Sequence, residues 1–379
     1  MPAAGVIDVL RRFLPRLPAG LRPRDEARQR AVWAITHCRT PELGGHLHAC
    51  ADCGTRHFAW HSCNHRACPQ CGRAATAQWV TRELGKRIAA PYYMVTFTLP
   101  SELRHLFQGP DAKAAFDLFF AASSAALAES LASPKGPRAA ISGFTGVLHT
   151  WNQRLHFHPH IHYLVPGGGL DADGRYVIVK NAQFLAPLPP LRRRFRSHFH
   201  ERLKALGCEV DPAVWRKDWG IHIQPFGSGE NAIKYLGAYI SRTAIGDRRI
   251  VSLGEDSVTF RWKDRAQGGR ERLDTISGAE FCTRYLRHVL PRGMRSVRYF
   301  GFCHPSAKAT RERVAFQSGR RLVLAEAPPE APPVAPVKLA TPLPLCPCCR
   351  RPMPRLVQLK PAFQRGPPRD APARNRETR

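Results

Sequence analysis

The segment between residues 31 and 75 is dense in cysteine and histidine and has no long apolar run. A segment of this size cannot bury enough apolar surface to hold its own fold, so a bound metal would have to stabilise it. Two CxxC motifs stand 14 residues apart, a spacing close to that of a zinc ribbon, and supply Cys50, Cys53, Cys68 and Cys71. Four thiolates make a closed tetrahedral zinc site with no position for a reacting water. We therefore predict a structural zinc ion in a domain over residues 31–80.

Further cysteines leave the number of zinc ions open. Cys38 and Cys63 lie near the two motifs and, with neighbouring histidines, are candidates for a second zinc ion. Cys346 and Cys349 form another CxxC motif, but it lacks a partner pair, and we predict no metal site there. The chain shows no secretory signal, so we expect a cytoplasmic protein whose 12 cysteines bind metal or lie buried rather than form disulfides.

The charge balance indicates a polyanionic partner. The sequence has 58 Lys and Arg against 29 Asp and Glu, a formal net charge of +29. Neutralising phosphates releases counterions, so nucleic acid is the usual partner of such a chain, with an Arg-rich composition that serves no binding as the alternative. Arg66 and Arg73, beside the CxxC motifs, are predicted to contact DNA. No apolar run is long enough to cross a membrane, and no membrane partner is expected.

The rest of the chain predicts one mixed α+β domain between two less regular ends. Residues 1–30 are expected to form a helix and a connector, residues 85–305 the mixed domain, and residues 306–379 a Pro-rich linker and a basic disordered tail. Apolar periodicity places the elements of the mixed domain. Strands are expected at residues 92–99, 144–151, 158–165 and 219–224 and within 249–276, and helices at 111–132, 191–206, 229–241 and 278–290.

The stretch His158-Pro-His-Ile-His162 is the most informative part of the mixed domain. Side chains at positions i and i+2 of a strand face the same way, so His160 and His162 project together while Ile161 points into the core. Two neutral imidazoles and one further polar ligand would leave positions open for a phosphate oxygen, an arrangement that suits Mg²⁺ or Mn²⁺ in phosphoryl transfer. Four residues are candidates for the third ligand: His149, His158, Gln153 and Asn231.

A pair of tyrosines follows in the helix expected after Gly229. Tyr235 and Tyr239 are four residues apart, which places both phenols on one face of a helix. A tyrosine oxygen can attack a phosphodiester and carry the DNA end covalently. Two tyrosines at this spacing more often pack in a core. They indicate catalysis here because the strand with the histidines lies upstream in the sequence. Lys234 and Arg242 flank the pair and are predicted to contact phosphate.

Taken together, these motifs resemble one family of DNA-processing enzymes. The likeness runs from about residue 30 to 300 and includes SCNHRACPQC at residues 62–71, VLHTWNQRLHFHPHIHYLVPGGG at 147–169 and GSGENAIKYLGAYISR at 227–242. The order of these motifs is similar to that of the HUH nucleases, in which U is a hydrophobic residue. More narrowly, the chain resembles the IS91 family of rolling-circle insertion-sequence transposases. One departure is Ala67, where members of the family often carry a histidine.

The resemblance implies a fold, a reaction and a set of site residues. It implies an antiparallel sheet flanked by helices, with the histidines on a central strand and a zinc-binding domain in front. His160 and His162 would bind the catalytic ion. Tyr235 and Tyr239 would be the nucleophiles, forming 5′-phosphotyrosine links and leaving free 3′ hydroxyls. The expected partner is single-stranded DNA at the ends of the element and at the target site, with no small-molecule substrate, in a cytoplasmic, nucleoid-associated protein.

Two other functions remain open at this point. A plasmid replication initiator or relaxase would use the same chemistry, and only the zinc domain and the sequence around the histidines favour a transposase. A non-catalytic zinc-ribbon protein that binds DNA is the alternative from a different class, in which the histidines and tyrosines would have no chemical role. The position of the tyrosines relative to the histidines separates the enzyme from the binding protein.

Overall fold

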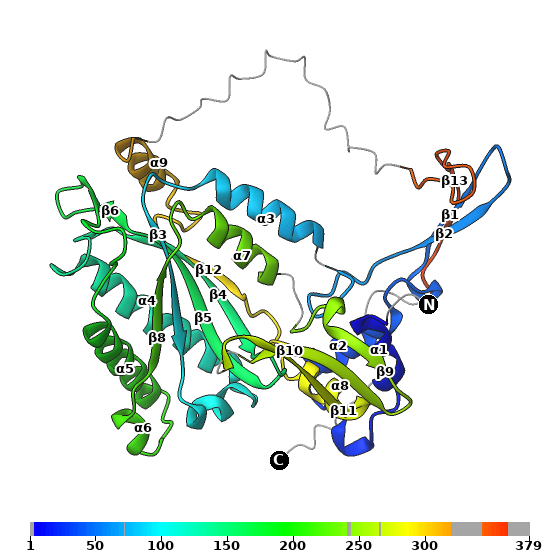
Figure 1. Cartoon of the computed structure of the whole chain (residues 1–379), viewed down its shortest axis with the longest axis horizontal. Helices are drawn as coiled ribbons and strands as arrows, with labels where there is room; N and C mark the ends of the chain where they lie inside the picture. The colour runs from blue at the N-terminus through cyan, green and yellow to red at the C-terminus, as the bar shows by residue number, and fades with distance from the viewer. Residues whose placement is uncertain (1–3, 72, 241–243, 265–266, 320–342, 363–379) are drawn as a thin grey trace, which may run out of the picture.

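A five-stranded antiparallel sheet forms the centre of the computed structural model, which describes residues 4–71, 73–240, 244–264, 267–319 and 343–362 (Figure 1). The side chains of residues 73–75 and 238–240 lie outside this description. The strand order is β12-β4-β5-β3-β8, so neighbours in the sheet are mostly distant in the sequence. Their bounds are β3 Tyr92–Thr98, β4 Gly143–Trp151, β5 Phe157–Pro166, β8 Gly220–Pro225 and β12 Val297–Gly301.

Helices cover both faces of this sheet (Figure 1). Strand alternation sends Tyr93, Val95 and Phe97 of β3 to one face, where they join a large apolar cluster with α4 and α5. Tyr92 and Met94 point to the opposite face and pack in a smaller cluster with α3 and α7. The helices are α3 Arg73–Gly85, α4 Ala112–Ala132, α5 Leu188–Ala205 and α7 Glu230–Ile240. The central unit is therefore a three-layer α+β structure, and the predicted fold class is confirmed.

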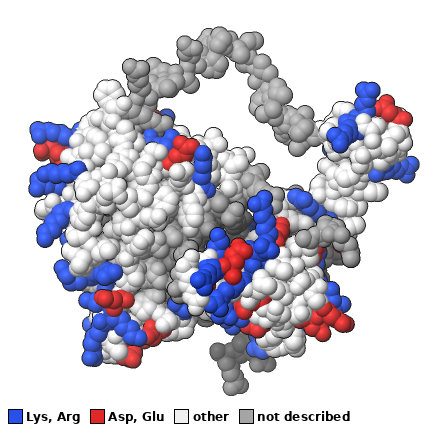
Figure 2. All heavy atoms as spheres, viewed as in Figure 1, with Lys and Arg blue, Asp and Glu red and all other residues white. Residues whose placement is uncertain are grey.

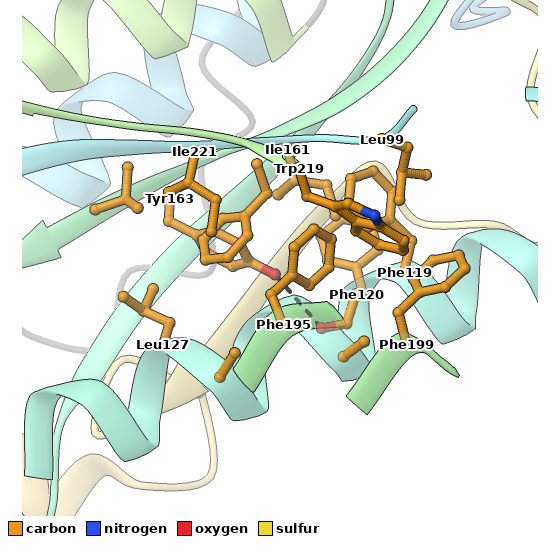
Figure 3. Close-up of a cluster of buried hydrophobic side chains, with 14 of the residues drawn as sticks. Leu99, Phe119, Phe120, Leu127, Ile161, Tyr163, Phe195, Phe199, Trp219 and Ile221 are labelled. Carbon is orange, nitrogen blue, oxygen red and sulfur yellow. Dashed lines mark hydrogen bonds between the residues drawn. The ribbon is translucent and has the colours of Figure 1, made fainter. Parts of the chain in front are cut away.

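Aromatic side chains fill the larger cluster (Figure 3). Phe195 of α5 is fully buried and lies 5.0 Å from the ring of Phe97 and 5.1 Å from that of Trp219, both edge to face. The buried hydroxyls of Tyr163 and Ser123 bond each other at 2.7 Å, so this core leaves neither of them without a partner. Among the described residues, α4 is the helix long and apolar enough to cross a membrane, and here it forms the floor of this core.

The N-terminal helices pack against elements from the second half of the chain. Helices α1 (Val6–Phe13) and α2 (Glu26–His37) share one apolar cluster with residues from β9 to α8. Gly278 begins α8, and a Cβ there would lie 2.3 Å from the ring of Phe13, so only glycine allows this approach. The bounds are β9 Ile250–Leu253, β10 Ser257–Asp264, β11 Arg270–Ser277 and α8 Gly278–Leu286.

The C-terminal segment, expected as a linker and tail, contains regular structure at both of its described parts. Helix α9 covers Lys308–Gln317, and strand β13 (Arg355–Leu359) pairs with β1 (Gly45–Ala49), which pairs in turn with β2 (Arg56–Trp60). This pairing joins residues from the two ends of the chain, which is why the sequence pattern alone did not reveal it. Residues 320–342 and 363–379 of the expected linker and tail lie outside the described residues. Other short elements include β6 Gly168–Leu170, β7 Tyr176–Ile178 and α6 Ala213–Arg216.

The burial of Phe195 in the aromatic core predicts a large loss of stability for Phe195→Ala. Removing this buried ring should lower the free energy of unfolding by about 3–5 kcal/mol, because a cavity remains among rings that cannot collapse into it. Phe316→Ala is the matched control, since that ring on α9 is 74% exposed. Denaturant unfolding of both variants measures the difference, and equal shifts would contradict this description of the core.

Candidate active site and metal centres

Three histidines meet on the α7 side of the sheet. Strand register places His149 of β4 opposite His160 of β5, and Thr96 of β3 opposite His162. One ring nitrogen from each of His149, His160 and His162 lies within 4.8 Å of the others, close enough to share one ion. Ile161, between the two β5 histidines, is fully buried on the other face, as the strand alternation predicts.

Hydrogen bonds orient two of these imidazoles. Nδ1 of His160 lies 2.7 Å from the carbonyl oxygen of His158, and Nδ1 of His162 lies 2.9 Å from Oγ1 of Thr96. A ring that donates from Nδ1 carries its lone pair on Nε2, which is the tautomer a metal ligand needs. Both bonds come from the sheet itself, so the strands that place the rings also hold their orientation.

The surroundings of the third histidine favour its neutral form. His149 is buried, and burial together with the neighbouring His162 and His160 holds its pKa well below the usual range. His158 lies on the same face of β5, with its ring centroid 5.2 Å from that of His160, but its Nδ1 lies 2.9 Å from the guanidinium of Arg104 and the ring does not belong to the group of three. Gln153 lines the adjoining cavity without joining the cluster, and Asn231 is exposed on α7. Of the four candidates for a third ligand, the structure brings His149 alone to the pair.

A cavity of about 820 Å³ opens over the three histidines. Tyr235 of α7 lines it, with its ring centroid 6.5 Å from that of His162 and the two ring planes at 83°. Other residues of its lining include His222 of β8, Trp262 of β10 and Arg154. None of these three was predicted from the sequence. The strand alternation of β8, opposite Thr96, is the one signal that could have pointed to His222.

The second predicted tyrosine and two of the predicted DNA contacts have side chains outside the described residues. Tyr239 belongs to α7, but its side chain lies outside the described residues, as do Arg242 and the side chain of Arg73. Lys234 is exposed on α7 and forms an ion pair of 2.7 Å with Glu230, one helical turn earlier. Its side chain remains accessible to a phosphate, and its role stays a prediction.

The cysteines form two groups of four, which differ from the predicted ligand set. One group joins Cys68 and Cys71 to Cys38 and Cys63, and the other joins Cys50 and Cys53 to Cys346 and Cys349. The single ribbon site predicted from Cys50, Cys53, Cys68 and Cys71 is therefore wrong in its pairing, as is the expectation that Cys346 and Cys349 lack a partner pair. The reason is that β1 pairs with β13, which carries one CxxC motif to the other end of the chain.

The geometry of the first group fits one zinc ion. Sγ of Cys71 lies 3.7 Å from Sγ of Cys38 and 3.7 Å from Sγ of Cys63. Thiolates about 2.3 Å from a tetrahedral zinc lie roughly 3.8 Å apart. The thiols of Cys63 and Cys68 donate toward Cys38 and hold the pKa of Cys38 well below its usual range, which favours a thiolate at Cys38.

Arg66, predicted to contact DNA, forms hydrogen bonds within the protein. Its guanidinium donates to the carbonyl oxygens of Met294, Leu290 and Pro291 at 2.6, 2.8 and 3.0 Å. These bonds occupy both terminal nitrogens and tie the cysteine loop to the segment that follows α8. These bonds give Arg66 a role in the fold, and its contact with DNA stays a prediction.

Comparison with known proteins agrees with this arrangement. A family described as "Putative transposase" matches residues 143–311, and one described as "Transposase zinc-binding domain" matches residues 9–99. The chain is 36% identical to "Putative transposase y4qJ" of Sinorhizobium fredii over 318 residues, covering 78% of this chain and 79% of the relative. The chain belongs to the IS91 family of transposases.

A second relative is also a transposase. This IS91-family chain is 29% identical over 305 residues to the "Transposase for insertion sequence element IS801" of Pseudomonas savastanoi pv. phaseolicola, covering 72% of this chain and 69% of the relative. No solved structure matches. The family profiles cover both the histidine strand and the first group of cysteines, so the chain is a transposase with a zinc-binding domain.

Replacing Arg66 separates its two possible roles. Arg66→Ala should lower the free energy of unfolding by about 2 kcal/mol, because the change removes charged donors from three carbonyls. The salt dependence of DNA binding should stay unchanged, whereas losing a phosphate contact would reduce its slope by about one. Arg295→Ala, an exposed arginine beside the same segment, is the control for stability. A reduced slope without a loss of stability would instead assign Arg66 to phosphate contact.

Proposed function

We propose that this transposase cuts and rejoins single-stranded DNA through a covalent bond between DNA and Tyr235. The observation that carries the proposal is the meeting of a phenol with three imidazoles in one cavity. A non-catalytic DNA-binding protein would have no need for Tyr235 to line the cavity over His149, His160 and His162. A replication initiator or relaxase would use the same site, and the family membership favours transposition.

The three imidazoles are proposed to bind a divalent ion. Their ring nitrogens come from two neighbouring strands and leave the cavity side of the group open to oxygen ligands. Mn²⁺ accepts imidazole ligands more readily than Mg²⁺, which prefers oxygen, so the donor set favours Mn²⁺ of the two predicted ions. A bound ion would act as a Lewis acid on a phosphate oxygen. The first group of cysteines is proposed to hold the structural zinc of the domain.

The proposed reaction is a transesterification at phosphorus. Oη of Tyr235 loses its proton and attacks the phosphorus, and the bond from phosphorus to the 3′ oxygen of the preceding nucleotide breaks. That oxygen takes up a proton and leaves as a free 3′ hydroxyl, while the DNA beyond the cut stays joined to the enzyme as a 5′-phosphotyrosine. Attack by a 3′ hydroxyl reverses the reaction, so rejoining needs no nucleotide cofactor. Tyr239 remains the proposed second nucleophile for a second strand.

A basic surface beside the cavity supports the binding of a DNA strand. Figure 2 shows Lys and Arg side chains gathered over the β10–β11 hairpin, with acidic side chains between them. Trp262 of β10 lines the cavity, and the guanidinium of Arg154 lies 5.2 Å from its ring centroid. An aromatic face backed by a cation is a suitable surface for stacking an unpaired base. We propose that single strands at the ends of the element and at the target site bind here, in the cytoplasm near the nucleoid.

The covalent link is tested with end-labelled oligonucleotides. Wild-type protein should convert a 3′-labelled strand into a species that stays with the protein on a denaturing gel, and a 5′-labelled strand into a free shorter fragment. Tyr235→Phe should abolish or strongly reduce the first adduct, because a phenyl ring has no attacking oxygen. Tyr176→Phe, a tyrosine outside the cavity, is the control.

The site of attachment can be read by mass spectrometry. Trypsin cleaves after Lys234 and Arg242, so both tyrosines fall in one peptide, YLGAYISR. Fragmentation of the nucleotide-bearing peptide from wild-type protein should place the phosphate on Tyr235 in the first cut. An adduct outside this peptide would disprove the assignment of the nucleophile.

Metal binding is tested by removing the ligand from β4. His149→Ala should weaken Mn²⁺ binding by more than about tenfold. Replacing a residue that only hydrogen-bonds to a ligand already costs about that much, and the loss of the ligand itself should cost more. His158→Ala should bind Mn²⁺ as the wild type does, since that ring is not part of the group of three and its Nδ1 contacts Arg104. Titration followed by the electron spin resonance of free Mn²⁺ measures both. Equal affinity of wild type and His149→Ala would exclude His149 as a ligand.

A further inference from the structure

The second group of cysteines is made of two turns with the same backbone geometry. In the first turn, the N–H of Cys50 donates to the carbonyl of Thr55 at 2.9 Å, and the N–H of Gly54 donates to the carbonyl of Cys50 at 3.1 Å. In the second turn, the N–H of Cys346 donates to the carbonyl of Arg351 at 2.8 Å, and the N–H of Arg350 donates to that of Cys346 at 2.9 Å. The two turns therefore match bond for bond.

The residue that ends each turn also has the same unusual conformation. Gly54 has a φ of +68° and Arg350 has a φ of +58°, both in the left-handed region that glycine adopts readily and arginine rarely. An arginine held there costs free energy that the surrounding structure has to offset. A metal ion bound by the cysteines of the turn is a source of that free energy.

The sulfur atoms are spaced for a shared ion. Sγ of Cys50 lies 3.3 Å from Sγ of Cys349, and Sγ of Cys53 lies 3.5 Å from Sγ of Cys346 and 3.8 Å from Sγ of Cys349. Disulfide sulfurs lie about 2.05 Å apart, whereas thiolates on one tetrahedral zinc lie roughly 3.8 Å apart. Cys348, between the last two cysteines, is exposed and is not a member of the group.

The apolar contacts around this group are few. Its buried cluster consists of Cys50, Cys346 and Met353. Pairing of β1 with β13 and a contact of 3.1 Å between Nδ1 of His48 and the carbonyl of Met353 add hydrogen bonds. So small a core cannot hold a three-stranded sheet in water, and small domains of this kind usually depend on a metal or a disulfide.

We propose that Cys50, Cys53, Cys346 and Cys349 bind a second zinc ion, and that this ion fastens residues 343–362 to the β1–β2 hairpin. Cys53 and Cys346 are 293 positions apart in the sequence, and Cys50 and Cys349 are 299 positions apart. An ion shared by these cysteines closes the chain into a ring that includes the whole five-stranded sheet. The zinc-binding family profile ends at residue 99 and contains one of the two turns. The zinc ribbon is thus assembled from both ends of the chain, and its site is separate from the group around Cys38.

Metal content of the full-length protein tests the site. Protein purified under reducing conditions should contain two zinc ions per chain. The double variant Cys346→Ser/Cys349→Ser should contain one, and the matched control Cys348→Ser should keep two. Replacing zinc by cobalt gives a second readout, because absorbance from thiolate-to-cobalt charge transfer should fall by half in the double variant only. One zinc in the wild type, or two in the double variant, would overturn the proposal.

Cutting the chain before residue 343 tests whether the ion holds residues 343–362 to the β1–β2 hairpin. A specific protease site inserted within residues 325–335 allows cleavage of the full-length protein after it has folded. The C-terminal fragment should remain bound through gel filtration in wild type and Cys348→Ser, and should separate in Cys346→Ser/Cys349→Ser or after zinc is chelated. A fragment that separates with zinc present, or that stays bound in the double variant, would contradict the role given to the ion. Neither experiment depends on DNA cleavage.

Discussion

The antiparallel pairing of β4 with β5 is the interaction on which the candidate active site depends. Two histidines two residues apart on one strand can point the same way, but they supply only two nitrogens. The register that sets His149 opposite His160 brings in a third nitrogen from the neighbouring strand. Because side chains on a strand alternate, a shift of this register by one residue would turn His149 to the other face and leave the pair without it.

The rest of the fold holds this row of side chains in place and brings DNA-binding surface to it. On one face of the sheet, the aromatic core under α4 and α5 fixes the strands. On the other face, α7 carries Tyr235 to the cavity. The cysteine loop takes part as well, since Oη of Tyr285 in α8 donates to the carbonyl of Ala67 at 2.6 Å. Cys38 and Cys68 share an apolar cluster with β10, the strand that presents Trp262. A zinc ion in the first group would thus stabilise the wall of the cavity from behind.

The sequence predicted what depends on local pattern and missed what depends on distant pairing. Strand alternation identified His160, His162 and the buried Ile161, and helical spacing placed Tyr235 and Tyr239 in one helix. The third ligand stayed open among four residues, because the turn between β4 and β5 decides the register. In that turn the Asn152 side chain accepts the N–H groups of Arg154 and His156, a detail that spacing does not reveal.

The cysteines and Arg66 also show that the sequence does not reveal which distant residues a side chain contacts. CxxC motifs were paired by closeness in the sequence, whereas the β1–β13 ladder pairs one of them with residues near position 346. Arg66 was assigned to DNA from its charge, but its neighbours turned out to be three carbonyl oxygens. In both cases the chemical type of the residue was informative, and its partner was decided by residues far away in the chain.

Electron spin echo spectroscopy of Mn²⁺ bound to the protein with a single-stranded oligonucleotide tests the central claim most directly. The account predicts modulation from imidazole nitrogens and from a DNA phosphorus in the same spectrum, because one ion would contact both. Phosphorus modulation without nitrogen would mean that the DNA holds the ion without the histidines. That result would contradict the role assigned to His149, His160 and His162.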